Sequence, residues 1–406
     1  MSEMKDSEID TIGLVPESWK ETRLKYLCEV QTGNEDTQNA NPDGQYPFYV
    51  RSPIIEHCDR FTFDGEGILV AGDGAGAGRI FHHVYGKYAV HQRVYRLSDF
   101  KFNADFIHYY LSNLFPHEMD KGSAQSTVPS MRLPMLLNFK FFLPAIDEAK
   151  KITLFLDSKC AEIDSLVADI QSEIETLEEY KRSVITEAVT QGLSREVEMK
   201  DSGIEWIGMI PKHWKIDKIK YHLRRNELRN PGNVQVLSVY REFGVIPKES
   251  RDDNHNVTSE DTSKYKYVKP GVLVINKMKA WQGSMGVSEY EGIVSPAYFI
   301  YEFTDNVVVG KYLHYLLRNV YKDEFRRISG GIREGQWDLP AAGFESEYIT
   351  IPPVKEQQDI VFYLDETIAN IEEIISMKQE QLSTLEEYKK SVIYEYVTGK
   401  KEVPLS

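Results

Sequence analysis

Three features of secreted and membrane proteins are missing from this chain of 406 residues. Its three cysteines, Cys28, Cys58 and Cys160, lie far apart and form no C-x-x-C pair, so the sequence indicates neither a disulfide framework nor a zinc framework. No apolar run approaches the length that spans a membrane, and the polar start MSEMKDSEID is unlike a secretion signal. We therefore expect a cytoplasmic protein with reduced thiols and no membrane partner.

Catalytic motifs are missing as well. Adenine methyltransferases carry N-P-P-Y or D-P-P-Y, and the nearest segments, Asn41-Pro42-Asp43 and Asn230-Pro231-Gly232, are typical of turns. The adjacent His82 and His83 point to opposite faces of an expected strand, so they do not form a metal site. We expect no catalytic residue, no metal ion and no cofactor.

The stretch GILVAGDGAGAGRIF, from Gly67 to Phe81, resembles a nucleotide-binding loop only superficially. Four of its glycines, from Gly72 to Gly78, stand at every second position, without the Lys-Ser of a phosphate loop and without G-x-G-x-x-G. We interpret it as a strand, a loop and a second strand. A nucleotide-dependent enzyme built on this loop remains an alternative, which binding of ATP or S-adenosylmethionine to the isolated chain tests.

The chain contains an internal duplication. Leu143 to Gly192 aligns without a gap with Ile351 to Lys400, at an offset of 208 and with 20 of 50 positions identical. A 22-residue stretch from Lys5 matches one from Lys200 at 11 positions, at an offset of 195. Each half therefore consists of a short leading segment, a central region and a long helical segment.

The central regions match more loosely. Gly67-Ile-Leu-Val aligns with Gly271-Val-Leu-Val, and DFIHYYL from Asp105 matches KYLHYLL from Lys311, a short helix in both halves. The remaining strands and turns predict an α/β globule in each half. The expected organisation is a leading segment at 1–19, a globule at 20–142, a long helix at 143–193, a second leading segment at 194–214, a second globule at 215–350, a second long helix at 351–400 and a tail at 401–406.

Both long segments have the 4-3 spacing of a coiled coil. Prolines at 144 and at 352–353 precede them, where a helix tolerates proline. The expected seam positions are Ile163, Val167, Ile170, Ile174, Leu177, Lys181, Val184 and Ala188 in the first segment, and Ile371, Ile375, Lys378, Leu382, Leu385, Lys389, Val392 and Tyr396 in the second.

The net charge of −15 does not exclude DNA as a partner. The long segments 143–193 and 351–406 carry charges of −6 and −5, whereas the globules at 20–142 and 215–350 carry −1 and +2. A balanced globule can still present a basic face to phosphate groups.

These motifs together resemble one family over essentially the whole chain. The motif I-G-x-x-P-x-x-W (Ile12 and Ile207), the motif P-x-x-x-E at the start of each long helix and the repeated TLEEYK–SVI are similar to the specificity (S) subunit of type I restriction-modification systems. The resemblance implies an α+β protein with pseudo-twofold symmetry, in which two long antiparallel coiled-coil helices separate two α/β target recognition globules.

The same resemblance implies the function. Each globule reads one half of a bipartite, asymmetric site in double-stranded DNA, and the helices dock two methyltransferase (M) subunits. The subunit is not catalytic, because its partners supply methylation and, through a restriction/motor (R) subunit, translocation and cleavage. A stand-alone, two-headed architectural or regulatory DNA binder is the alternative.

Candidate DNA contacts lie in glycine-containing loops, because Arg and Lys pair with guanine edges and Gln with adenine edges. We expect the glycines after Ala71 to bring that loop close to DNA, with Arg79 as its cation. The repeated Tyr-Lys pairs are candidates for partner docking or for coiled-coil packing. The DNA candidates are Arg79, His91, Gln92, Arg93, Ser123, Gln125 and Ser126, then Lys277, Lys279, Trp281, Gln282, Arg333, Gln336 and Trp337; the docking candidates are Tyr180, Lys181, Tyr388 and Lys389.

Overall fold

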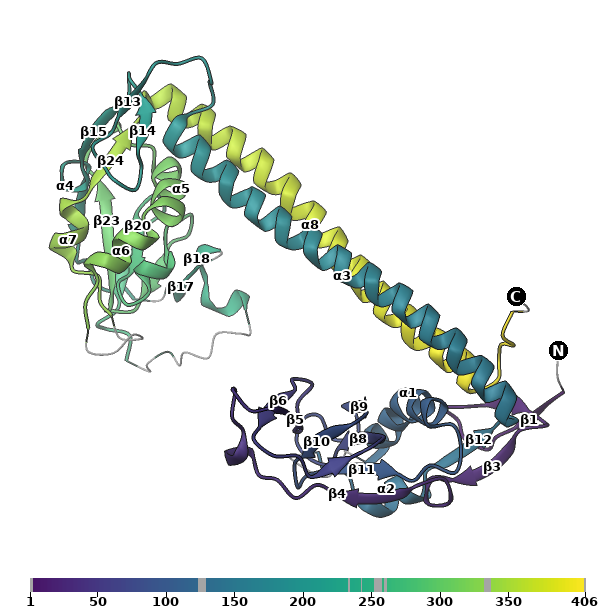
Figure 1. Cartoon of the computed structure of the whole chain (residues 1–406). Coiled ribbons are helices and arrows are strands. Elements are labelled where there is room, and N and C mark those ends of the chain that lie inside the picture. Colours follow the sequence, from purple (N-terminus) through teal and green to yellow (C-terminus); the bar gives the residue numbers. More distant parts are fainter. Residues whose placement is uncertain are drawn as a thin grey trace. The chain divides into compact units, whose positions relative to one another are not determined.

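The chain divides into two compact units, each of which includes part of both long helices (Figure 1). The structure is a computed structural model that describes residues 3–122, 129–232, 234–241, 243–251, 258, 261–331 and 337–404. The first unit comprises Met1–Gln171 and Gln379–Ser406, and the second comprises Ser172–Lys378. The long helices are α3 (Ile146–Gln191) and α8 (Val354–Val397).

Helices α3 and α8 run antiparallel. In the first unit the rings of Phe155 and Tyr396 lie 4.5 Å apart, and Lys389 Nζ lies 2.6 Å from Asp164 Oδ1. As the residue number rises along α3, that of its partner on α8 falls, which confirms the antiparallel pairing. Every seam position predicted from the 4-3 spacing is buried or half-buried, whereas most neighbouring positions are exposed, so the coiled coil is confirmed as well.

The helix pair repeats its own contacts. The ion pair of Lys389 with Asp164 in the first unit has a counterpart in the second, where Lys181 Nζ lies 3.7 Å from Glu372 Oε1. Both residues of one pair differ from those of the other by the sequence offset of 208. The duplication detected in the sequence is therefore also a duplication of tertiary contacts, as pseudo-twofold symmetry requires.

The first globule contains two four-stranded sheets and a long helix (Figure 1). The order of the main sheet is β4-β11-β8-β9, all antiparallel, and all five residues of its strand β8 are buried. The elements of this globule and its leading segment are β1 (Met4–Asp6), β2 (Leu14–Pro16), β3 (Lys20–Arg23), β4 (Glu29–Thr32), β5 (Tyr46–Tyr49), β6 (Glu56–Cys58), β7 (Phe63–Asp64), β8 (Gly67–Ala71), β9 (Phe81–Val84), β10 (Lys87–Val90), β11 (Val94–Ser98), α1 (Ala104–Gly122), α2 (Leu133–Asn138) and β12 (Lys140–Leu143).

The second globule repeats this plan. Its main sheet has the order β16-β23-β20-β21, which corresponds strand by strand to that of the first. Strands β15 and β24 pair as β3 and β12 do. The elements are β13 (Met199–Asp201), β14 (Met209–Pro211), β15 (Lys215–Lys218), α4 (Ile219–His222), β16 (Leu223–Asn226), β17 (Leu237–Tyr240), β18 (Gly244–Pro247), β19 (Lys266–Val268), β20 (Leu273–Asn276), β21 (Met285–Val287), β22 (Gly292–Val294), β23 (Tyr298–Phe303), α5 (Gly310–Val320), α6 (Lys322–Ile328), α7 (Ala341–Ser346) and β24 (Tyr348–Ile351).

The two motifs that open each half meet in space. The buried indole of Trp19 donates its Nε1–H to Glu148 Oε1 at 3.3 Å, and Trp214 donates to Glu356 Oε1 at 3.0 Å. Each glutamate stands in the first turn of its long helix, where a carboxylate is also stabilised by the helix dipole. The tryptophan of the leading segment and the glutamate of P-x-x-x-E therefore anchor each globule to the start of its helix.

A second anchor joins each globule to its helix about three turns after the helix begins. The hydroxyl of Tyr109 on α1 donates to Asp157 of α3 at 2.7 Å, and that of Tyr315 on α5 donates to Asp365 of α8 at 2.6 Å. The neighbouring histidines also correspond: burial lowers the pKa of His108 to about 4 and that of His314 to about 3. Both are neutral near pH 7, as expected for structural histidines.

The three cysteines are free and buried. Within the described ranges, no group of His, Cys, Asp and Glu side chains is arranged to hold a metal ion. No helix in the described part of the chain combines the length and the apolar character needed to cross a membrane.

Candidate nucleic-acid interface

The glycine-rich loop connects two antiparallel strands, β8 and β9, as predicted. Most of its glycines are required by close packing within the protein. A Cβ on Gly72 would lie 2.9 Å from the Arg93 carbonyl oxygen, and one on Gly78, at φ +64°, would lie 2.5 Å from Met119 Cγ. Gly76 is similarly crowded, and only Gly74, at φ +77°, faces open space. Packing inside the protein therefore accounts for three of the four glycines. The approach of this loop to DNA stays a prediction.

Within this loop, Asp73 binds two arginines. Asp73 accepts hydrogen bonds from Arg93 Nη1 at 3.0 Å and from Arg51 Nη1 at 2.9 Å. Gln92 is exposed next to them and donates to Asp36 at 2.8 Å. The predicted Gln92 and Arg93 therefore form one oriented polar surface, to which Arg51 adds a cation that sequence reasoning missed because it lies 42 positions away in the chain.

His91 does not lie on this surface. It is buried, and its Nδ1 accepts the Arg93 backbone N–H at 3.0 Å. Burial lowers the pKa of the imidazole, so it stays neutral and shapes the turn that presents Gln92 and Arg93. The structure thus places His91 in the interior, in contrast to the exposed position that we expected.

Five predicted DNA contacts lie outside the described residues. They are Ser123, Gln125 and Ser126 in the first globule, and Arg333 and Gln336 in the second. The predicted contact Arg79 is about half exposed, and it forms an ion pair with Asp120 of α1.

In the second globule, two loops that are distant in the sequence come together. Lys277, after β20, donates to Asp338 Oδ2 at 2.6 Å. The rings of Trp281 and Trp337 lie 5.6 Å apart, and the Arg326 guanidinium lies 5.8 and 5.7 Å from their centroids. Both tryptophans were predicted separately, whereas Arg326, on α6, was missed. This group offers aromatic faces and a cation, a combination that can stack on bases.

Two polar atoms in the loop after β20 lack a partner in the described part of the protein. They are Trp281 Nε1 and Gln282 Oε1, both buried. The predicted Lys279 is exposed beside them. Because buried polar groups are normally hydrogen-bonded, this loop is one place in the second globule where a bound ligand can supply missing partners.

A residue at corresponding helix positions contacts the loop after the central strand in both globules. Asp120 and Arg326 correspond at the offset of 206 that also relates His108 to His314. In the first globule this position pairs with a loop arginine, and in the second it lies over two loop tryptophans. The scaffold is therefore shared, while the chemistry that each loop presents is different.

A group of cations lies near the same loop of the second globule. Burial lowers the pKa of Lys322, and so does the positive charge of Arg318, Arg182 and Arg241. Such a concentration of positive charge attracts phosphate groups. Sequence reasoning missed it because its members come from three separate segments.

The four docking candidates differ in position. Tyr180 and Tyr388 are 54% and 49% exposed on the long helices. Lys181 and Lys389 instead occupy the seam and form ion pairs across it. Their positions are consistent with a docking role for the tyrosines and a packing role for the lysines.

Comparison with known proteins bears on this arrangement. Residues 16–176 match the family described as the type I restriction modification DNA specificity domain. This part of the chain belongs to that family. The type I restriction enzyme EcoDI specificity subunit of Escherichia coli is 20% identical over 95% of this chain and 89% of its own length. The MjaVIII specificity subunit of Methanocaldococcus jannaschii is 24% identical over 95% and 93%.

The fold comparison agrees with the family. A chain from a solved structure on complex assembly and conformational transition of the type I R-M system covers 95% of this chain and 99% of its own length, with a TM-score of 0.67 and 14% identity. The predicted fold class is confirmed, and so is the resemblance to type I specificity subunits. The relatives named here are specificity subunits, which agrees with the prediction of a recognition component without catalytic activity.

Proposed function

We propose that this specificity subunit reads a bipartite, asymmetric site in double-stranded DNA, with one half-site for each globule. The observation that carries the proposal is the contrast between scaffold and loops. The sheet order and the anchors to the helices are repeated, whereas Arg79 with Asp120 in one globule corresponds to Trp281 with Arg326 in the other. A repeated frame with unlike loops is expected of a protein that performs one task on two different sequences.

The exposed side chains fit this task. In the first globule, Arg93 and Gln92 have the donors that recognise guanine and adenine in the major groove. In the second, Lys279 offers a cation and the tryptophan group an apolar face for a thymine methyl. The cations around Lys322 provide phosphate contacts. The reading residues therefore differ in kind between the two globules.

The long helices carry the proposed docking surfaces for two methyltransferase subunits. Every large apolar side chain exposed on α3 has an exposed apolar counterpart on α8 at the offset of 208. An exposed apolar side chain is of no benefit to a solvated helix, so its recurrence at four positions favours two copies of one partner. The pairs are Ile146 and Val354, Leu154 and Phe362, Leu166 and Ile374, and Tyr180 and Tyr388.

The restriction/motor subunits would join through the methyltransferase subunits, in the cytoplasm where the DNA lies. The chain alone is proposed to bind neither ATP nor S-adenosylmethionine, because the sequence lacks both a Walker lysine and an adenine-methylation motif. Calorimetric titration of the purified chain with each ligand tests this, and stoichiometric binding of either would contradict it.

The central experiment exchanges the first globule, residues 20–142, for the corresponding region of another specificity subunit. Mapping of methylated adenines in host DNA should then show one changed half-site and one unchanged half-site. A change in both halves would refute independent reading. Tight, specific DNA binding by the lone chain, unaffected by added methyltransferase, would instead favour a stand-alone, two-headed DNA binder.

A further inference from the structure

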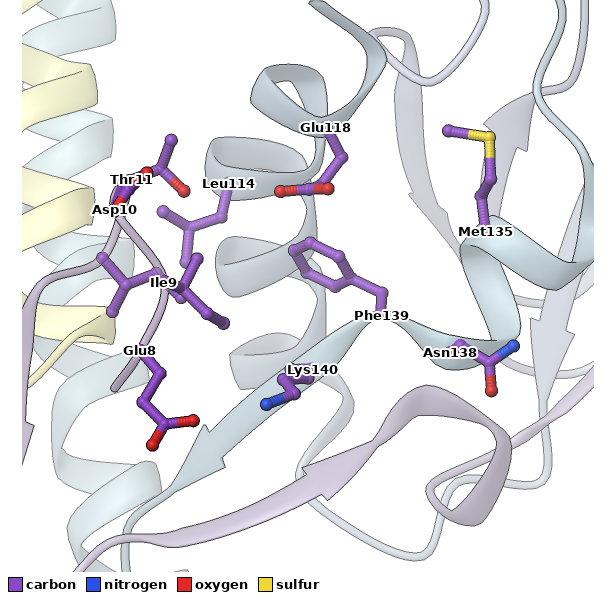
Figure 2. Close-up of a pocket in the computed structure, with 11 residues that line it drawn as sticks. Glu8, Ile9, Asp10, Thr11, Leu114, Glu118, Met135, Asn138, Phe139 and Lys140 are labelled. Carbon is purple, nitrogen blue, oxygen red and sulfur yellow. The ribbon is translucent and has the colours of Figure 1, made fainter. Parts of the chain in front are cut away.

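An open pocket of about 360 Å³ lies in the first unit, lined by residues of the leading segment, α1, α2 and the start of β12 (Figure 2). Its volume falls in the range that holds a small ligand, about 300–1,000 Å³. Figure 2 shows the Phe139 ring projecting from the start of β12 toward Leu114 and Glu118 of α1, with Ile9 and Thr11 of the leading segment on the other side. The pocket therefore has an aromatic wall, aliphatic walls and a polar edge.

The second half of the chain fills the corresponding place with its own side chain. Thr11 corresponds to Trp206 at the offset of 195. The half-buried Trp206 ring packs edge-on against Tyr321, with centroids 6.0 Å apart. Tyr321 in turn corresponds to Phe115, at the offset of 206, and Phe115 packs edge-on against Phe139 of the pocket wall at 5.1 Å. The first half thus has a small side chain and a cavity where the second has an indole.

The edge of the pocket is acidic. Glu8, Asp10 and Glu118 line it. Lys140, the one cation among the described lining residues, forms an ion pair with Glu21 at 3.0 Å. Glu8 also has a positive φ of 58°, at the position where the second half has Gly203 at φ +66°. Glycine adopts this conformation without strain and glutamate does not. The first half therefore has a carboxylate at the pocket, on a backbone conformation that favours glycine.

We propose that this pocket binds an indole-sized aromatic ring that carries a positive charge beside it. The ring takes the place that Trp206 occupies in the second unit and packs against Phe139, and the positive charge faces Glu8 and Asp10. The inference does not depend on DNA reading or on methyltransferase docking. Two sources share this chemistry, a free aromatic amine and an aromatic side chain of a partner polypeptide next to a basic residue.

The test uses the full chain and three probes with one ring system: tryptamine, neutral indole and the anionic indole-3-acetate. Ligand-observed NMR and calorimetry should show one tryptamine per chain, with a Kd on the order of 1 mM or tighter for a ligand of this size. Tryptamine should bind most tightly and indole-3-acetate most weakly. No saturable tryptamine binding up to about 10 mM, or tighter binding of the anion, would overturn the proposal.

Variants locate the site. Thr11→Trp installs the side chain of the second half and should weaken tryptamine binding at least about tenfold. Leu14→Trp is the matched control, because Leu14 is exposed in the same segment and does not line the pocket. Glu8→Gly should weaken tryptamine binding about two- to fivefold and leave indole unchanged. Equal tryptamine binding by the natural chain and the Thr11→Trp chain would overturn the assignment.

A blocked Lys-Trp-Lys tripeptide distinguishes the two sources. Tighter binding of the tripeptide than of tryptamine assigns the pocket to a side chain of a partner polypeptide. Tighter binding of tryptamine assigns it to a free aromatic amine. If neither ligand binds the natural chain, the proposed pocket site is refuted. This result is independent of the globule exchange, so the pocket proposal and the DNA-reading proposal can fail separately.

Discussion

Replacement of Asp73 by alanine separates the orientation of Arg51 and Arg93, the arginines proposed to read DNA, from their charge. Asp73 accepts from Arg51 and Arg93 at 2.9 and 3.0 Å. The arginine side chains are 44% and 62% exposed, so each ion pair contributes only about 0.2–1 kcal/mol to stability. The Asp73→Ala chain should therefore stay folded, with a small loss of stability at most.

The free energy of sequence discrimination should fall far more than the free energy of unfolding. A bidentate contact of arginine with guanine contributes about 1–3 kcal/mol of discrimination, which corresponds to roughly 5- to 150-fold in affinity. Without Asp73, the Arg93 side chain is no longer ordered before binding, so it loses conformational entropy when it contacts the base. The net charge of the surface also rises by one positive unit. Specific affinity should fall, and non-specific affinity should stay equal or rise.

The assay is fluorescence anisotropy of the assembled complex with a duplex that carries the target and a duplex with a scrambled target, at several salt concentrations. Arg93→Ala should lower the ratio of the two affinities and relax one base position. Arg23→Ala serves as the control, because Arg23 is exposed and hydrogen-bonds Asn138, away from the loop. An equal loss on both duplexes for Arg93→Ala, with a salt slope reduced by about 0.9, would show a phosphate contact and refute base reading.

Three other outcomes are expected. Tyr180→Ala and Tyr388→Ala should each weaken binding at one of the two methyltransferase sites by about 2 kcal/mol. Native mass spectrometry resolves this as loss of one methyltransferase subunit. Equal loss at both sites would contradict separate docking surfaces. Trp214→Phe removes the hydrogen bond to Glu356, a charged acceptor, and should destabilise the second unit by about 1.5–3 kcal/mol in calorimetry; an unchanged transition would show that the bond is unimportant. Burial and a neighbouring carboxylate raise the pKa of Glu347 to about 7. Its contribution to stability should therefore be complete below pH about 4.5 and be lost as the pH rises through 7. Melting curves of the Glu347→Gln chain should lack this decline.

The repeat and the coiled coil were predictable from the sequence for a local reason. The seam residues of a coiled coil recur every three or four positions because of the helix repeat. The spacing alone therefore predicted that residues such as Ile163 and Val167 are buried. The offset of 208 also predicted the correspondence of Lys181 with Lys389, because duplicated sequences form the same local structure. The resemblance to specificity subunits depended on motifs of this kind, and the comparisons confirmed it.

The reading surface was predictable only in part. Loop composition correctly indicated Gln92, Arg93 and the two tryptophans as partly or fully exposed groups near glycine-rich turns. It wrongly placed His91 on the surface, because a histidine between polar neighbours gives no sign of the hydrogen bond that draws it inward. The packing role of the loop glycines was missed for the same reason, since the atoms that crowd Gly72 and Gly78 come from other segments.

Only the tertiary structure brought together residues that are far apart in the chain. Trp19 meets Glu148 across 129 positions, and Arg326 meets two tryptophans from different loops. The pocket is lined by Thr11 together with residues of α1, α2 and the start of β12, which local sequence does not reveal. Periodicity is a property of the chain itself, whereas a contact or a cavity depends on how separate segments pack, and packing is decided only when the whole unit folds.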